Sequence, residues 1–199
     1  LPEAAWADVL NSVIHESYYP AHVVGQFSRT WRYEGQLPAS SNSYYRSKGQ
    51  VANYPQVMYE IFGRLAEQFN DFVKPGWMDI RVHSHVFQRG TKLHWHLDSH
   101  GHCAMTWWPH RRWDCSWGGE LMVPYGSPVE VKPRWSFTNE YENAYLEKGM
   151  GVYITPKPNR CVITAPGVYH QVNRIDPDAG DNVRISVVGF LMSTDGEKP

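Results

Sequence analysis

The feature that most constrains the fold is a change of periodicity near residue 77. Beyond it, short stretches rich in β-branched and aromatic residues alternate with turn residues, and no helical pattern separates them. We expect nine strands, at 79–88, 92–97, 103–108, 119–124, 128–133, 151–155, 160–164, 169–174 and 183–192. Strands that follow one another without crossover helices predict a mainly β protein, an antiparallel sandwich or barrel, and not a parallel α/β sheet.

The first 76 residues have a different pattern. Apolar residues at helical spacing predict helices over 3–17 and from Val57 to Phe69. Between them the chain is polar from about Arg29 to Gln50, which predicts a long loop, and Tyr44 and Tyr45 in this loop are candidate lid or substrate-pocket residues.

No repeat, low-complexity tract or linker divides the sequence. We therefore expect one domain over 1–199, with helical support and a loop over about 1–76 and a β core over about 77–193.

Composition excludes several classes of protein. The formal net charge is −1, with 19 basic and 20 acidic residues and no basic run longer than a pair, so nucleic acid is not an expected partner. No stretch approaches the roughly 18 apolar residues of a membrane span, and the first residues lack the features of a signal peptide. The three cysteines form no CxxC, which favours free thiols in a reducing compartment, and we expect a cytoplasmic location.

The segment from Gly90 to Ser99 contains a candidate metal site. Side chains two residues apart on a strand project from one face, so His96 and Asp98 point together. They supply two ligands of a two-His, one-carboxylate facial triad, which leaves open positions on iron(II) for a chelating co-substrate and dioxygen. His170 lies 74 residues after His96, behind the turn Ala165-Pro166-Gly167, and is the expected third ligand.

A co-substrate with a free carboxylate also needs a fixed cation. Arg184 follows His170 by 14 residues and shares a strand face with Ser186, while Val183, Ile185 and Val187 take the other face. A guanidinium binds a carboxylate through two hydrogen bonds, and the serine hydroxyl adds another. The motifs occur in the order HxD, a long β-rich gap, His and then Arg-x-Ser. This combined order is much less expected by chance than any one of the motifs alone.

From Val86 to Phe190 the sequence resembles the 2-oxoglutarate and iron(II)-dependent dioxygenase superfamily, in its prolyl-hydroxylase-like branch. The matching blocks are Phe87-Gln-Arg-Gly90 before His96-x-Asp98, the aromatic segment Cys103 to Trp113, Gly118-Gly119-Glu120-Leu121, and His170 with Arg184. The resemblance implies a double-stranded β-helix (jelly-roll) core with helices outside. It also implies a metal-binding oxidoreductase, a hydroxylase, with iron(II), 2-oxoglutarate and dioxygen at the site.

The departures from the family pattern affect the co-substrate contacts. A family tyrosine nine residues before the first ligand is Phe87 here, and Tyr-Leu-Asn of the next strand is Trp108-Pro109-His110. We take Thr106 and Trp108, which face the same way, as further co-substrate contacts. Trp107 and Glu120 are expected at the substrate pocket, whereas His100, His102 and His110 are read as loop or pocket residues.

Family chemistry implies oxidative decarboxylation of 2-oxoglutarate coupled to hydroxylation, or a related C–H oxidation, of a small amino-acid-like metabolite or a peptidyl residue. Related halogenases lack the ligand aspartate, so Asp98 favours hydroxylation over halogenation. The sequence does not indicate the substrate or the oligomeric state.

Two other readings stay open. His94 lies on the same expected face as His96, so a cupin-type metalloenzyme could use His94, His96 and His170; otherwise His94 is a pocket residue. Against a cupin, its usual glutamate is absent and Arg184 has no role. A non-enzymatic β-sandwich binding module would leave the His, Asp and Arg set unexplained.

Overall fold

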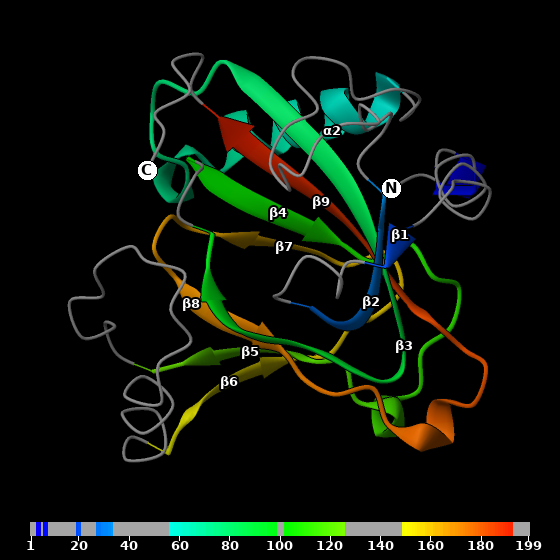
Figure 1. Ribbon diagram of the computed structural model, residues 1–199. Coiled ribbons are helices and arrows are strands. Elements are labelled where there is room, and N and C mark those ends of the chain that lie inside the picture. The colour runs from blue at the N-terminus through cyan, green and yellow to red at the C-terminus, as the bar shows by residue number, and fades with distance from the viewer. Residues whose placement is uncertain are drawn as a thin grey trace.

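The computed structural model describes residues 3–4, 6–7, 19–20, 27–33, 56–98, 102–125 and 149–192, with the backbone alone at 19–20, 27–33, 56–57, 83 and 94. Within them the chain forms one curled antiparallel sheet with a helix on its outside (Figure 1). No helix in these ranges is long and apolar enough to cross a membrane.

From α2 onward the described elements follow the expected order, a helix and then strands, and two strands precede α2. They are β1 (Tyr19–Pro20), β2 (Phe27–Tyr33), α2 (Gln56–Gln68), β3 (Asp79–Leu97), β4 (Cys103–Trp107), β5 (Leu121–Pro124), β6 (Gly151–Ile154), β7 (Cys161–Thr164), β8 (Tyr169–Val172) and β9 (Arg184–Met192). The mainly β class is confirmed.

Some segments differ from their expected structure, and others lie outside the described residues. The stretches 79–88 and 92–97 form the single strand β3, which continues through Gly90 at φ 78°. Residues 29–33, expected to begin a loop, belong to β2, which pairs with β1 and β3. A mixture of polar and aromatic residues suits a strand as well as a loop. The stretch 128–133 and most of 3–17 lie outside the described residues.

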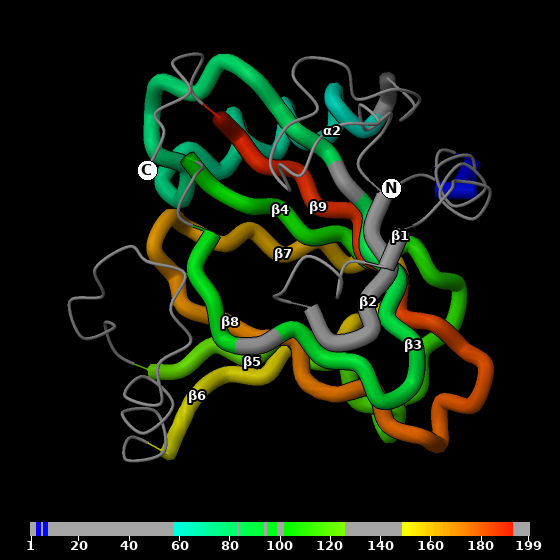
Figure 2. Tube along the Cα trace, in the orientation of Figure 1, coloured from blue at the N-terminus to red at the C-terminus, as the bar shows by residue number. Residues whose placement is uncertain are grey.

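The sheet has two halves joined by β3. Its order is β6-β5-β8-β3-β9-β4-β7. Residues 79–87 of β3 pair with β9, whereas residues 93–97 pair with β8. We call β9, β4, β7 and residues 79–87 the major half, and β8, β5, β6 and residues 93–97 the minor half. Figure 2 follows β3 as it bends from one half into the other.

The major half has a helix-covered face and an inner face. Val82, Met105, Val187 and Leu191 share a buried cluster with Met58 and Phe62 of α2. Side chains alternate between the two faces along a strand, so Phe87, Arg184 and Thr106 of these strands project to the opposite, inner face. Phe87 shares a second buried cluster with Leu93 and Val172 of the minor half. The inner faces of the two halves therefore face each other, and the site lies between them.

Candidate active site

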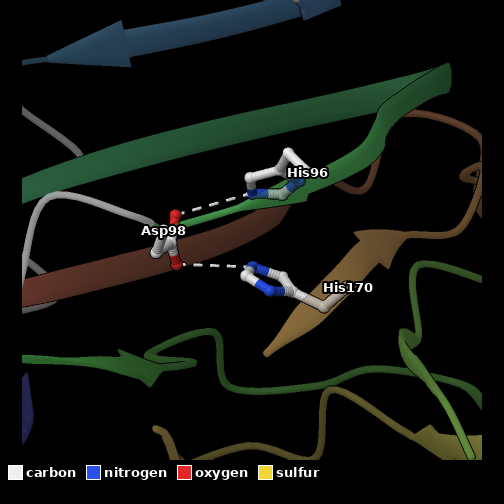
Figure 3. Close-up of side chains that lie close together, drawn as sticks. All are labelled: His96, Asp98 and His170. Carbon is white, nitrogen blue, oxygen red and sulfur yellow. Dashed lines mark ion pairs between the residues drawn. The ribbon is translucent and has the colours of Figure 1, made fainter. Parts of the chain in front are cut away.

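His96, Asp98 and His170 converge on one point of the minor half. One ligand atom from each lies within 4.8 Å of the others. The Asp98 carboxylate reaches both imidazoles, with Oδ1 3.7 Å from His96 Nε2 and Oδ2 3.4 Å from His170 Nε2 (Figure 3). The structure thus brings together the three ligands expected from the sequence, and no other group of three His, Cys, Asp or Glu ligands gathers in the described ranges.

A register shift in β3 places the histidines side by side. Leu93 is opposite Val172 and His96 is opposite His170. A step of three residues along β3 therefore matches a step of two residues along β8. Val172 and His170 project to one face of β8 because they are two residues apart. The bulge therefore lets both Leu93 and His96 project inward, which strict alternation would forbid.

This irregularity bears on His94. Its expected position on the same face as His96 assumed unbroken alternation, and the shift falls between Leu93 and His96. The His94 side chain is outside the described residues, so its two expected roles stay untested.

The charges of the triad reinforce one another. Burial raises the pKa of Asp98, but His170, His96 and His85 outweigh it and bring that pKa to about 2. Burial lowers the pKa of His170, and the Asp98 carboxylate reverses the shift and raises it. His170 Nδ1 lies 2.9 Å from the Val168 carbonyl. Since a carbonyl only accepts, Nδ1 carries the proton and Nε2 can bind a metal.

Arg184 lies on the inner face of the major half and is 1% exposed. Its Nε, Nη1 and Nη2 are buried and have no hydrogen-bond partner in the described part of the protein. The guanidinium carbon lies 4.9 Å from the Phe87 ring centroid and 5.4 Å from that of Trp108. Burial lowers the pKa of Arg184 to about 9, which Glu120 partly counters. The group remains a cation at neutral pH and is suited to an incoming carboxylate.

The other expected co-substrate residues share this inner face. Ser186 is opposite His85, and Thr106 is opposite Val188. Trp108 is fully buried, and its Nε1 has no partner among the described groups. Arg184 and Trp108 therefore both offer unused donors to one region.

Two neighbours of Arg184 were not singled out for this role from the sequence. A Cβ on Gly119 would lie 2.8 Å from Arg184 Cδ and 2.6 Å from Ile175 Cδ1, so only glycine leaves room for the arginine there. His110 is buried with Nε2 2.6 Å from the Pro156 carbonyl, and its Nδ1 has no partner among the described groups. Its spacing of two from Trp108 was the available signal.

Trp107, expected at the substrate pocket, does not lie on the inner face of the major half. Its side chain is in the buried cluster under α2, and its Nε1 donates to Asn159 Oδ1 at 3.1 Å. Trp108 follows the last residue of β4, and it is this tryptophan that lies beside the Arg184 guanidinium. Glu120 is partly exposed and accepts a hydrogen bond from Asn173 Nδ2 at 2.9 Å. Tyr44 and Tyr45 lie outside the described residues.

Comparison with known proteins identifies the fold. No protein-family model matches the sequence, and no curated protein matches it. Among solved structures, a prolyl-4-hydroxylase from Pseudomonas putida is similar over 97% of this chain and 88% of its own, with TM-score 0.60 and 14% identity. HygX from Streptomyces hygroscopicus, with nickel, 2-oxoglutarate and hygromycin B bound, is similar over 100% and 82%, with TM-score 0.60 and 12% identity.

A third similar structure is a prolyl hydroxylase from Trichoplax adhaerens in complex with a hypoxia inducible factor peptide fragment. It covers 97% of this chain and 80% of its own, with TM-score 0.55 and 11% identity. The expected jelly-roll fold is thereby confirmed, and this chain shares it with the prolyl hydroxylases to which it is similar.

Proposed function

We propose that this protein is an iron(II)- and 2-oxoglutarate-dependent oxygenase that hydroxylates, or otherwise oxidises at a C–H bond, a small amino-acid-like metabolite or a peptidyl residue. The observation that carries the proposal is the convergence of His96, Asp98 and His170 within 4.8 Å. Two imidazoles and one carboxylate on one side of a metal suit iron(II) with open positions on the other. Iron in such a site supplies dioxygen activation coupled to decarboxylation of the 2-oxo acid.

The residues of the chain have distinct tasks in this proposal. His170 is held in its metal-binding tautomer by the Val168 carbonyl. Asp98 stays ionised, since its pKa is about 2. Arg184 would bind the distal carboxylate of 2-oxoglutarate, with Trp108 Nε1 as a second donor and Ser186 and Thr106 on the same face. The apolar surroundings of Arg184 strengthen that ion pair by excluding water.

The alternative readings explain less. A cupin-type site has no need of the Asp98 carboxylate, yet this group lies against both His96 and His170. A β-sandwich binding module has no use for a buried guanidinium without a partner in the described part of the chain. The similar structures hold a peptide in one case and hygromycin B in another, which supports either a peptidyl or a small-molecule substrate.

The test combines binding and turnover. We expect iron(II) and 2-oxoglutarate to form a visible charge-transfer band under anaerobic conditions, and succinate to form when dioxygen is admitted. Asp98→Ala should abolish both. Arg184→Met should weaken 2-oxoglutarate binding about a hundredfold while leaving metal affinity unchanged, because a buried charged hydrogen-bonding partner is lost. A wild-type protein that binds no 2-oxoglutarate would overturn the proposal, and metal retention in Asp98→Ala with loss in His94→Ala would favour the cupin reading.

A further inference from the structure

Large apolar side chains are exposed on the minor half next to the metal ligands. On β5, β6 and their ends, Tyr125 is 57% exposed and Val152 is 41% exposed, and Met150 is exposed beside them. An exposed apolar surface of this kind commonly marks a binding site.

The strand register places part of this surface in line with the triad. Leu121 is opposite Val172 and Met122 is opposite Gln171, so one step further brings Val123 opposite His170. Val123 is in turn opposite Val152. Opposed residues on antiparallel strands project to the same face. His96, His170, Val123 and Val152 therefore form one row across the inner face of the minor half.

The spacing of strands sets the distances along this row. Neighbouring strands lie about 4.8 Å apart, so Val123 is about 5 Å and Val152 about 10 Å from His170 in the plane of the sheet. Tyr125 N donates to the Met150 carbonyl at 3.1 Å, which extends the pairing by one step. Tyr125 follows Val123 by two residues and shares its face. The row thus continues from the ligands to an open edge of the described sheet.

The chemistry of this face is uniform. Leu121, Val123 and Tyr125 from β5 and its end, and Val152 and Ile154 from β6, are aliphatic or phenolic. No Asp, Glu, Lys, Arg or His lies on the inner face of β5 or β6 as the structure describes them. Burying hydrocarbon against such a surface is favourable, and the surface offers no oppositely charged side chain to a charged group.

We infer that Val123, Tyr125 and Val152 form the substrate platform of the proposed oxygenase, and that it takes an aliphatic, uncharged side chain or hydrocarbon part of the substrate. The inference rests on the proposed function. Continuity with the triad selects a substrate over a protein partner as the occupant, because the row begins at a metal ligand and keeps within reach of the metal. Hydrocarbon held on the platform lies beside the position where C–H oxidation would occur.

Adjacent positions on β6 provide a matched pair of variants. Val152 belongs to the row, whereas Tyr153 follows it, projects to the other face and is 69% exposed. Val152→Lys places a cation on the platform. Tyr153→Lys places the same cation one residue away, on the face turned from the metal.

The experiment uses manganese(II) in place of iron(II) and saturating 2-oxoglutarate. Two probes of similar shape are compared by paramagnetic broadening of their proton signals: N-acetyl-L-leucinamide and N-acetyl-L-asparaginamide. We expect the leucine methyl signals to broaden strongly and the asparagine signals weakly. Val152→Lys should cut the leucine broadening about tenfold, and Tyr153→Lys should leave it unchanged, because only the first desolvates a charge against hydrocarbon.

Equal or stronger broadening of the asparagine probe would overturn the inference, as would the absence of leucine broadening or an equal effect of the two variants. The methylene signals of 2-oxoglutarate report separately on the triad and Arg184. Broadening of 2-oxoglutarate without leucine broadening would reject the platform and leave the proposed function standing. Loss of 2-oxoglutarate broadening in the wild-type protein would reject both.

Discussion

Arg184 is buried with three nitrogen atoms that meet no acceptor in the described part of the protein. Each buried donor without a partner costs about 1–3 kcal/mol of stability. The Trp108 indole and the His110 imidazole add two more such atoms nearby. A bound carboxylate would remove much of this cost, so we expect 2-oxoglutarate to raise the melting temperature of the protein.

Because Gly119 has no side chain, it leaves room for the Arg184 side chain. Gly119→Ala puts a Cβ 2.8 Å from Arg184 Cδ, so the arginine must shift. We predict that 2-oxoglutarate affinity falls about tenfold or more, the value of one charged hydrogen bond, while metal affinity is retained. Calorimetric titration with 2-oxoglutarate and with manganese(II) measures both constants.

Gly167→Ala is the control for backbone strain. Gly167 has φ +76°, close to the +74° of Gly119, but a Cβ there meets nothing within 4 Å. If both alanine variants weaken 2-oxoglutarate binding equally, the contact with Arg184 is not the cause.

His110 makes stability dependent on pH. Burial lowers the pKa of His110 in the folded protein to about 4, with Arg184 adding to the effect, against an ordinary value of 6.5. Between these values the unfolded chain binds the proton and the folded protein does not, so stability falls as the pH falls from 6.5 to 4. The full contribution is about 3 kcal/mol at 1.36 kcal/mol per pKa unit.

His110→Gln removes the titrating group and keeps an amide N–H for the Pro156 carbonyl. We predict a shallower decline of unfolding free energy between pH 6.5 and 4, measured by urea denaturation across that range. His102→Gln, at a histidine hydrogen-bonded to the Lys74 carbonyl, is the control. An unchanged slope in His110→Gln would contradict the assignment.

At the scale of elements, β3 and β8 position the proposed metal ligands, and two aromatic side chains pack together across the same pair of strands. Trp95 and Tyr169 stack with ring centroids 5.5 Å apart and planes 5° apart. Each precedes one of the two histidines of the triad, and the stack spans the strand pair at its register shift. A regular ladder is interrupted there, so the stack supplies contacts that hold the two strands together.

Tyr169→Ala should therefore lower metal affinity about tenfold, as loss of outer contacts to metal ligands commonly does. Tyr169→Phe keeps the ring and should bind metal as tightly as the wild-type protein. Competition with a chromogenic chelator measures the affinity. A loss of thermal stability in Tyr169→Ala without weaker metal binding would show that the stack supports the fold alone.

For the whole molecule, the two faces of the major half have different roles. The outer face packs against α2, and the inner face carries Arg184. Phe62 of α2 is fully buried against the outer face, where a Cβ on Gly189 would lie 2.5 Å from its ring. Phe62→Ala should cost about 3–5 kcal/mol of unfolding free energy, the usual cost of emptying such a site. In the folded protein 2-oxoglutarate affinity should stay unchanged, because Arg184 lies on the other face.

Urea denaturation and 2-oxoglutarate titration below the unfolding transition test both statements. Phe72→Ala, at a phenylalanine that is 56% exposed, should change stability little. A weaker 2-oxoglutarate constant in folded Phe62→Ala would mean that the two faces are coupled.

The sequence by itself determined the class of fold and singled out His96, Asp98 and His170, the three residues that the structure brings together. Alternating apolar residues over 79–192 specify strands, and residues two apart, such as His96 and Asp98 or Arg184 and Ser186, share a face for reasons local to the backbone. Local rules of this kind can be read from residue order.

Only the tertiary structure decided which of two adjacent residues faces inward and where alternation breaks. The choice between Trp107 and Trp108 depends on the register of β4 against β9, which places Trp107 opposite Val187 under α2. The bulge before His96 and the space at Gly119 arise from contacts between segments far apart in sequence. Register and close packing are properties of paired elements, and no single segment specifies them.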